Sequence, residues 1–448
     1  MDYIEPIQFS QYPTAAHFAI VQQKGYSYPR FRSHEKIKIP KANCEDKFRV
    51  TDIKRKSTVV GRLFILADGH GGPGCSEYFV RHTPEAVERL CENYTSEWTE
   101  KLKNNFQTDV KRMILRLDED YLYRKRKELE QDEDVDNDGC TLILNIFLGD
   151  WMINVNVGDS RTILISAPIP MPGKPDLVNT DGVLGMDNDY KMDVVFASQD
   201  HKPYLEHLAR EILENGGEFV DSVQNRVIKV EVDKLREDRL AKRGSLKNAR
   251  IRPKGHEVEG EMERIPSLNV ARSCGDLDFK MNPAHKIISC EPDVTFIKIK
   301  KVKKRHFLFM STDGTFDYMY EETADKQNRA IAKMIGTMIE KGERAGKYLL
   351  EEDESEYNDN QRKDCNPRVI IESMEEDGSQ SSDQSDNQEP GIPLLYRELT
   401  EEETYTRKIK ERTLIHSARY FANREGAQTF FASTLQDYDD CTIILVEI

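Results

Sequence analysis

The sequence predicts an α+β fold, in which short and mostly antiparallel strands pack in layers against helices. Three observations support this prediction. Apolar runs of strand length end in tight turns, two long segments carry apolar residues at helical spacing, and strands and helices come in clusters instead of alternating strictly. Of the 448 residues, 38% are hydrophobic, which is enough for a large core. No apolar run reaches the roughly 18 residues that a membrane-spanning helix needs, so we expect no such helix.

The expected elements follow from these patterns in chain order. Gly149-Asp150 joins two apolar runs as a two-residue hairpin turn, and Asn215-Gly216 closes a helix. We expect strands at residues 17–22, 46–51, 62–67, 141–148, 151–157, 162–165, 307–310 and 442–448. We expect helices, whose apolar residues recur about every 3.6 positions, at residues 75–92, 98–130, 205–214, 323–339 and 401–424.

Charge is distributed unevenly along the chain, and two segments stand out. Residues 351–404 hold 18 acidic and 4 basic residues, a net charge of −14 against −15 for the whole chain. Their low hydrophobicity predicts an acidic, disordered insertion at 351–400. Residues 234–254 hold nine Lys or Arg and two acidic residues, within a basic insertion at 234–263. This insertion is either a solvated loop with a short helix or a docking site for an acidic partner. No aromatic residues interleave with the basic ones, so we do not expect a nucleic-acid partner.

The N-terminus and the cysteines bear on domain organisation and compartment. Residues 1–40 contain four prolines and are expected to form an extended arm before one domain at 41–448. The first residues show neither the apolar core of a signal peptide nor the Arg-rich character of a transit peptide. The eight cysteines are scattered without C-x-x-C pairs, which favours free thiols in a reducing compartment. We therefore expect the cytosol or the nucleus.

Residues 64–74 carry the strongest sign of chemistry. An apolar run ends in Asp68, Gly69 and His70, which predicts a buried strand that delivers a carboxylate and an imidazole to its end. Taken alone, this pattern fits a metal site and a plain Asp-Gly turn equally well. Further acidic residues stand at the ends of other apolar runs or beside them: Glu45, Asp46, Asp136, Asp313 and Asp439. If these carboxylates converge, oxygen ligands without clustered His or Cys favour Mg²⁺ or Mn²⁺.

Taken together, these residues resemble the metal-dependent protein phosphatases of type 2C, a serine/threonine phosphatase family. The resemblance spans residues 43–446, and its segments keep the family's order. They are Asn-Cys-Glu-Asp-Lys-Phe48, Ala67-Asp-Gly-His-Gly-Gly72, Asp138-Gly-Cys-Thr141, Asn156-Val-Gly-Asp-Ser-Arg161, Gln199-Asp-His-Lys-Pro203, residues 268–280, Cys290-Glu-Pro292, residues 311–317 and Asp439-Asp-Cys-Thr442. The resemblance implies a four-layer α-β-β-α sandwich, with two central and mostly antiparallel β-sheets flanked by helices.

The resemblance also implies a set of metal ligands. Asp68 would bridge two Mg²⁺ or Mn²⁺ ions. Asp313 and Asp439 would be further ligands of one ion. Glu45 and the backbone carbonyl of Gly69 would bind the other ion.

Three further residues receive roles from the same resemblance. Asp46 would orient metal-bound water, Asp136 would bind a weaker third metal ion, and His70 would be the general acid. The implied reaction is the hydrolysis of phosphoserine and phosphothreonine in proteins by a water that the two metals activate, without a phosphoenzyme. The cysteines would then be structural, since no Cys or Ser nucleophile is required.

Two positions depart from the family pattern. Lys41 stands where many relatives have an arginine that grips the substrate phosphate, and we expect Lys41 to bind this phosphate as a point charge. The usual Asp-Asn pair near the end is Asp439-Asp440 here. The alternative function is a catalytically weak pseudophosphatase scaffold that binds phosphoproteins. We expect a monomer that acts on phosphorylated proteins. A mitochondrial location, which the departure at Lys41 permits, is the alternative to cytosol or nucleus.

Overall fold

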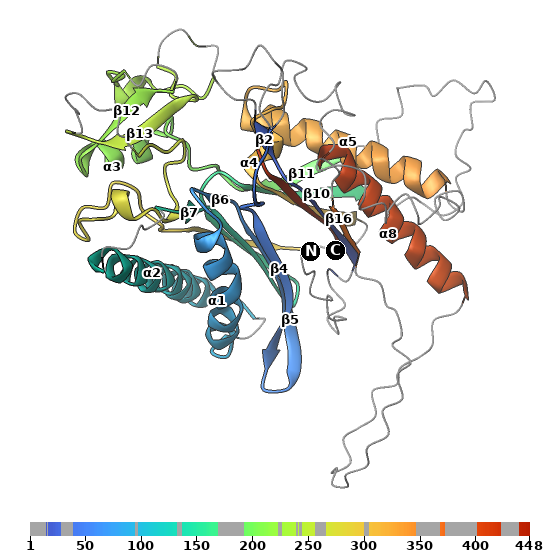
Figure 1. The fold of residues 1–448 in the computed structure, drawn as a ribbon. Helices are drawn as coiled ribbons and strands as arrows, with labels where there is room; N and C mark the ends of the chain where they lie inside the picture. Colours follow the sequence, from blue (N-terminus) through green and yellow to red (C-terminus); the bar gives the residue numbers. More distant parts are fainter. Residues whose placement is uncertain are drawn as a thin grey trace.

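Two β-sheets form the centre of the molecule, and helices cover their outer faces (Figure 1). This computed structural model describes residues 15, 17–27, 39–94, 97–131, 137–168, 192–222, 226–238, 241, 244–255, 266–299, 304–345, 368–371, 401–422 and 439–448.

The five-stranded sheet has the order β15-β9-β8-β5-β4, and every neighbouring pair is antiparallel. Its strands are β4 (Lys47–Arg55), β5 (Thr58–Ala67), β8 (Leu142–Leu148), β9 (Trp151–Val157) and β15 (Asp293–Lys298). Gly149 has a φ of 58°, which the tight turn between β8 and β9 requires. The hairpin that the sequence predicts at Gly149-Asp150 is therefore confirmed.

The six-stranded sheet has the order β11-β10-β16-β18-β1-β17 and is also antiparallel throughout. Its strands are β1 (His17–Gln23), β10 (Arg161–Pro168), β11 (Asp193–Ala197), β16 (Lys304–Ser311), β17 (Arg368–Ile371) and β18 (Cys441–Glu447). β1 pairs with β18, so the expected strand of the N-terminal arm lies inside the body of the domain.

Four long helices form the outer layers. α1 (Gly74–Cys91) and α2 (Glu100–Glu130) lie on the five-stranded sheet, and α5 (Ala324–Ala345) and α8 (Glu401–Ala422) lie on the six-stranded sheet (Figure 1). The Thr99 side chain caps α2 by accepting a hydrogen bond from the backbone N–H of Leu102 (3.3 Å). All four helices were expected, within a few residues at each end.

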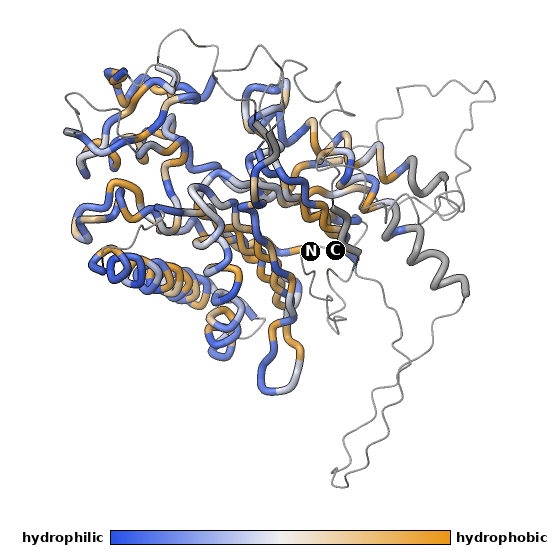
Figure 2. Tube along the Cα trace, in the orientation of Figure 1, coloured by the Kyte–Doolittle hydropathy of each residue, from blue (hydrophilic) through white to orange (hydrophobic). Residues whose placement is uncertain are grey.

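Three apolar clusters hold these layers together. In β5, Leu63 and Ile65 pack toward α1 and α2, whereas Phe64 and Leu66 point into the cluster between the two sheets. This alternation is the two-residue period of a strand that is buried on both faces. The apolar stretches concentrate along the central strands (Figure 2). The result is an α-β-β-α arrangement, so the predicted four-layer sandwich is confirmed.

A smaller unit with its own apolar cluster extends from the sandwich. It contains α3 (Glu206–Glu214), β12 (Gly217–Asp221), η2 (Val232–Lys234) and β13 (Ala249–Pro253), with β12 and β13 paired. β13 corrects the prediction of a solvated loop at this end of the basic insertion. Arg252 bonds Glu218 at 2.6 Å, and Lys247 donates to a backbone carbonyl at 2.5 Å. Part of the basic charge is thus used inside the fold.

The remaining short elements complete the chain. They are β2 (Tyr26–Ser27), β3 (Ile39–Pro40), β6 (Gly69–His70), β7 (Gly139–Cys140), β14 (Cys274–Gly275), η3 (Leu277–Phe279) and α4 (Asp313–Phe316).

In the acidic insertion, β17 pairs with β1, so the expectation of disorder is wrong for these residues. The rest of 351–400 lies outside the described residues.

Two expectations concern membrane helices and cysteines. Among the helices that the structure describes, none has the length and apolar character to cross a bilayer. All seven cysteines in the described part of the chain are free thiols, and six of them are buried. The eighth, Cys365, lies outside it.

Candidate functional site

Four carboxylate-bearing segments meet at one end of the two sheets. Asp46 precedes β4, Asp68 follows β5, Asp313 follows β16, and Asp439 precedes β18. β4 and β5 are antiparallel neighbours in one sheet, and β16 and β18 are antiparallel neighbours in the other. The start of one strand and the end of its partner therefore lie together in both pairs.

Asp46 ties the two sheets together at this end. Its side chain is buried, and one carboxylate oxygen, Oδ2, accepts hydrogen bonds from the hydroxyls of Thr312 (3.1 Å) and Thr442 (2.7 Å). The other oxygen, Oδ1, is buried without a hydrogen-bond partner. Burial and the nearby Asp440 raise the pKa of Asp46 to about 7. A buried carboxylate oxygen without a partner, in negatively charged surroundings, is a group that a cation or a bound water would satisfy.

Asp68 and Asp313 stand beside each other. The backbone N–H of Asp313 points at Oδ2 of Asp68, 3.4 Å away. Burial raises the pKa of Asp68, and Asp46, Asp313 and Asp439 raise it further by charge repulsion. Burial followed by the charges of Asp317 and Asp159 likewise raises the pKa of Asp313. The carboxylates at this place therefore carry more negative charge than the neighbouring lysines neutralise.

Glu45 and Gly69 lie against each other, next in the chain to Asp46 and Asp68. Oε1 of Glu45 accepts the backbone N–H of Gly72 (2.8 Å). A Cβ at position 69 would lie 2.5 Å from the backbone oxygen of Glu45, so only glycine fits here. The close approach of these two backbone segments is consistent with a ligand role for the Gly69 carbonyl.

Lys41 lies against the carboxylates. Its ammonium pairs with Glu45 (3.2 Å), with Asp439 and with Asp440 (3.5 Å). Burial lowers the pKa of Lys41, but Asp439 and Asp440 raise it, and the net shift is upward. Asp440 is buried and also accepts the backbone N–H groups of Gly25 (2.5 Å) and Glu45 (2.8 Å). Asp440 therefore has a structural role, which leaves Asp439 as the more exposed carboxylate.

His70 pairs with a residue that the sequence did not single out, Asp276. Nε2 of His70 lies 2.9 and 3.0 Å from the two carboxylate oxygens of Asp276. The small sheet β14-β7-β6 brings them together, because Gly139 of the middle strand pairs with His70 on one side and Gly275 on the other. A Cβ on Gly139 would lie 2.3–2.5 Å from the Asp276 carboxylate. The two side chains thus meet across a glycine.

Three more charged residues reach the site without having been predicted. Lys202 is buried and pairs with Asp159, and its ammonium also lies 3.8 Å from Asp317 and 4.0 Å from Asp313. Burial lowers the pKa of Lys202, while Asp159 and Asp317 raise it well above its usual value. The sequence contains Asp159 in Asn156-Val-Gly-Asp-Ser-Arg161, Lys202 in Gln199-Asp-His-Lys-Pro203 and Asp317 in residues 311–317, but nothing in these segments indicates that they meet.

The donor set fits a divalent metal. Its members are carboxylates and a backbone carbonyl, which suit Mg²⁺ or Mn²⁺. In the described part of the chain, no three His, Cys, Asp or Glu side chains stand close enough to hold an ion as they are placed. Asp136, expected to bind a third ion, lies outside the described residues.

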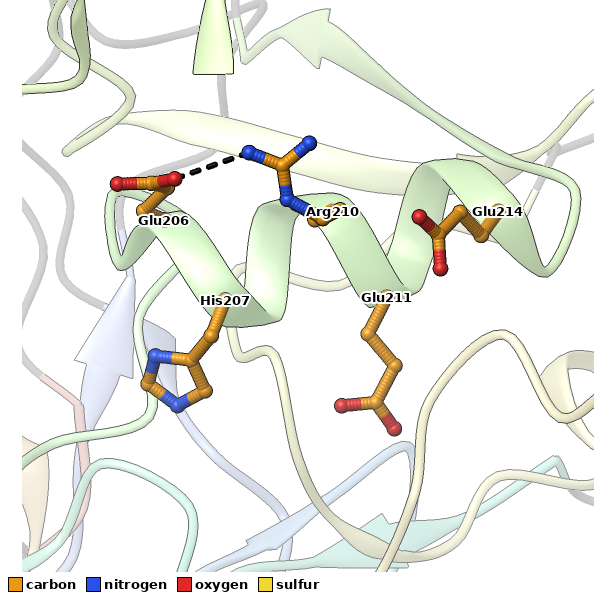
Figure 3. Close-up of a pocket in the computed structure, with 5 residues that line it drawn as sticks. All are labelled: Glu206, His207, Arg210, Glu211 and Glu214. Atoms are coloured by element: carbon orange, nitrogen blue, oxygen red, sulfur yellow. Dashed lines mark hydrogen bonds and ion pairs between the residues drawn. The ribbon is translucent and has the colours of Figure 1, made fainter. Parts of the chain in front are cut away.

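A separate hollow of about 380 Å³ lies along α3 (Figure 3). It is lined by Glu206, His207, Arg210, Glu211 and Glu214, and Arg210 pairs with Glu206 along the helix (2.9 Å). All five residues come from one helix of the smaller unit, with no buried polar group aimed into the hollow. Its three carboxylates stand unburied on one helix, whereas those of the carboxylate site come from four separate segments.

Comparison with known proteins identifies the family. The family model described as "Protein phosphatase 2C" matches residues 41–334. A relative in Schizosaccharomyces pombe, "Protein phosphatase 2C homolog 3", is 23% identical over 283 residues, which are 62% of this chain and 49% of that protein. "Probable protein phosphatase 2C 55" of Oryza sativa subsp. japonica is 27% identical over 157 residues, 32% of this chain and 38% of that protein.

This chain thus spans half or less of the length of these two relatives. Among solved structures, a serine-threonine phosphatase 2C from Toxoplasma gondii matches with a TM-score of 0.48 and 15% identity, over 99% of this chain and 98% of that one. The family model covers well over half of the 448 residues. The chain belongs to the protein phosphatase 2C family.

Proposed function

We propose that this protein removes phosphate from phosphoserine and phosphothreonine in proteins, with Mg²⁺ or Mn²⁺ as cofactor. The observation that carries the proposal is the meeting of Asp46, Asp68, Asp313 and Asp439 at one end of the two sheets, beside His70. Two such ions, and a weaker third, would supply charge neutralisation for the phosphate and a nucleophile at neutral pH. Family membership supports the reaction class, and the substrate proteins are part of the proposal.

Each carboxylate has a distinct part in this proposal. Asp68, which feels the charges of Asp46, Asp313 and Asp439, would serve both ions, one together with Asp313 and Asp439 and the other together with Glu45 and the Gly69 carbonyl. Asp46, fixed by two threonine hydroxyls, would orient a water through its unpartnered oxygen. Asp136 would hold the third ion. The two hydrogen bonds to Asp46 would keep the reorganisation of this carboxylate small during the reaction.

His70 would act as the general acid. Nε2 of the ring is held by Asp276, so Nδ1 is left to give its proton to the departing serine or threonine oxygen. Burial lowers the pKa of His70, the Asp276 carboxylate raises it, and the net shift is upward, which favours the imidazolium at neutral pH. The side chain is 28% exposed, so a substrate can reach it. General acids of this kind contribute about 10²–10⁴-fold to the rate.

Lys41 would bind the substrate phosphate once metal ions have taken over its carboxylate partners. Its ammonium now neutralises Glu45, Asp439 and Asp440. Divalent ions supply that positive charge more strongly, and an ammonium freed at the edge of the site becomes available to an anionic substrate. We keep the cytosol or nucleus as the expected location and a monomer as the expected state.

The test is phosphate release from a phosphothreonine peptide and from p-nitrophenyl phosphate. We expect turnover with Mn²⁺, none after chelation with EDTA, and none in the Asp68→Asn variant. The rival reading, a pseudophosphatase scaffold, predicts binding of the phosphopeptide without turnover of either substrate. A wild-type protein that binds Mn²⁺ and the peptide yet releases no phosphate would decide for the scaffold.

Metal binding should also raise thermal stability. The carboxylates repel one another in the metal-free protein, and an ion that binds only the folded state stabilises it by about 2.7 kcal/mol at 100 times its dissociation constant. For a domain of this size that corresponds to a rise in melting temperature of about 3 °C. Differential scanning calorimetry with Mn²⁺ measures it. Asp68→Asn should remove most of the rise, and an equal rise in that variant would place the ion elsewhere.

A further inference from the structure

A fully buried ion pair lies behind the His70–Asp276 contact. Asp118 of α2 and Lys280, just after η3, both have side chains with 0% exposure. The ammonium of Lys280 lies 3.0 and 3.1 Å from the two carboxylate oxygens of Asp118. A pair of charges removed completely from water carries a large desolvation cost, so its presence calls for an explanation beyond packing.

The remaining hydrogen bonds of this pair go to the segment that leads into Asp276. Oδ1 of Asp118 accepts the backbone N–H of Gly275 (2.8 Å), and the Lys280 ammonium donates to the carbonyl of Ser273 (2.8 Å). The hydroxyl of Ser273 in turn donates to the Asp276 carboxylate. The ion pair therefore holds the backbone at Ser273 and Gly275, on both sides of Cys274. Gly275 directly precedes Asp276, whose carboxylate contacts His70.

Asp276 needs such support because its backbone is in an unfavourable conformation. Its φ of 56° and ψ of 63° lie in the left-handed region, which non-glycine residues seldom adopt. Its backbone N–H donates to the carbonyl of Asp138 (3.0 Å). If the segment relaxed, the Asp276 carboxylate would turn away from the His70 ring. The ring would then lose its contacts with Asp276, which are the described contacts that tie it to this loop.

We propose that Asp118 and Lys280 are positioning residues, which hold Asp276 against His70 and so set the direction in which His70 delivers its proton. Neither residue touches the carboxylate cluster or the substrate. Their effect would travel through the backbone at 273–276 to the Asp276 carboxylate and from there to the imidazole. This inference rests on the proposed role of His70 as general acid and adds the groups that orient it.

The test uses the double variant Asp118→Leu/Lys280→Met in the full chain. Removing one partner alone would leave a buried charge uncompensated and threaten folding, whereas apolar replacement of both partners is often tolerated. Leu has the branching of Asp and Met nearly the length of Lys, so the double variant keeps the approximate shape of the pair and removes its hydrogen bonds to Ser273 and Gly275. A thermal melt close to that of the wild type shows that the fold is intact.

Two substrates then separate positioning from a general structural effect. A phosphothreonine peptide has an alkoxide leaving group that needs a proton, whereas nitrophenolate leaves p-nitrophenyl phosphate without one. We expect kcat for the peptide to fall about 10–100-fold. We expect kcat for p-nitrophenyl phosphate to change less than about twofold, with KM unchanged for both. In a His70→Ala background, the double substitution should cause no further loss on the peptide.

The matched control is Lys111→Met, on the same helix. Lys111 pairs with Glu291 at 2.7 Å and joins α2 to the segment before β15. Its loss should leave the ratio of the two activities unchanged. An equal fall on both substrates in the double variant, a further loss in the His70→Ala background, or no loss on the peptide would overturn the proposal.

Failure of the proposed function is distinguishable from failure of this inference. If the wild type releases phosphate from neither substrate, the proposed function is wrong, and the ring of His70 still reports its orientation. The ¹⁵N signals of the His70 ring, assigned by their loss in His70→Gln, are sensitive to the hydrogen bond at Nε2. We expect the double variant to shift them. Unchanged ring signals would refute the positioning role independently of any activity.

Discussion

Replacing Asp313 with alanine is expected to abolish phosphatase turnover, by about 10³-fold or more, while the protein stays folded. Asp313 begins α4 at the edge of the carboxylate cluster, and its side chain is still 13% exposed. Its pKa is raised by burial and by the negative charges of Asp317 and Asp159, so in the metal-free protein the carboxylate is under repulsion. Removing it takes away a proposed metal ligand and relieves that repulsion.

The expected result for Asp313→Ala is therefore a melting temperature without metal that equals or exceeds the wild-type value, together with lost turnover at saturating Mn²⁺. Asp325→Ala is the control, because Asp325 forms only a surface pair with Arg329 (2.8 Å), with both side chains more than 70% exposed. It should leave turnover unchanged. Wild-type activity in Asp313→Ala at saturating Mn²⁺ would contradict the two-metal assignment.

Replacing Gly139 with alanine is expected to lower kcat for a phosphothreonine peptide by about 10²-fold. The new Cβ would lie 2.3–2.5 Å from the Asp276 carboxylate, which must then leave the position where it bonds His70. Gly139 lies in the middle strand of the small sheet, between the strands that carry His70 and Gly275. The new methyl group would therefore stand between the Asp276 carboxylate and the His70 ring. Steady-state kinetics on the peptide and on p-nitrophenyl phosphate measure the effect, which should be much smaller for the second substrate.

Gly216→Ala serves as the control for the loss of a glycine. A Cβ there meets nothing within 4 Å, although its φ of 88° makes the substitution mildly strained. We expect a loss of about 1 kcal/mol in stability and an unchanged ratio of the two activities. If Gly139→Ala lowered both activities equally, the His70–Asp276 contact would not be what the substitution disrupts.

The helices and the long strands were predictable from the sequence because their apolar residues repeat at a clear period. β5 and β8 are buried on both faces and read as continuous apolar runs. β15, with the sequence Asp-Val-Thr-Phe-Ile-Lys, is short and half-buried, and it was missed. β13 was missed because Arg250 and Arg252 suggested a solvated loop. Arg250 donates a hydrogen bond to Ser267 and Arg252 donates one to Glu218, partners that the sequence alone does not reveal.

The carboxylates of the site were found through motifs, whereas their charged neighbours were not. Asp68 and Asp313 each follow an apolar run and precede a glycine, a pattern that is visible in sequence. Lys202 meets Asp159 across 43 residues, and His70 meets Asp276 across 206. Such pairs depend on how two sheets and a small connecting sheet are stacked. Local propensity carries no information on that stacking, so these roles required the three-dimensional arrangement.

The position of β18 in the six-stranded sheet has a consequence for biosynthesis. β18 lies between β16 and β1, and the Gln22 side chain reaches Thr442 across 420 residues (3.1 Å). Asp439, immediately before this strand, belongs to the carboxylate cluster. A nascent chain on the ribosome therefore lacks both an interior strand and a proposed metal ligand until residues 439–447 have emerged. Such late closure of long-range contacts is slow, and the proposed metal site would stay incomplete until this last strand has joined the sheet.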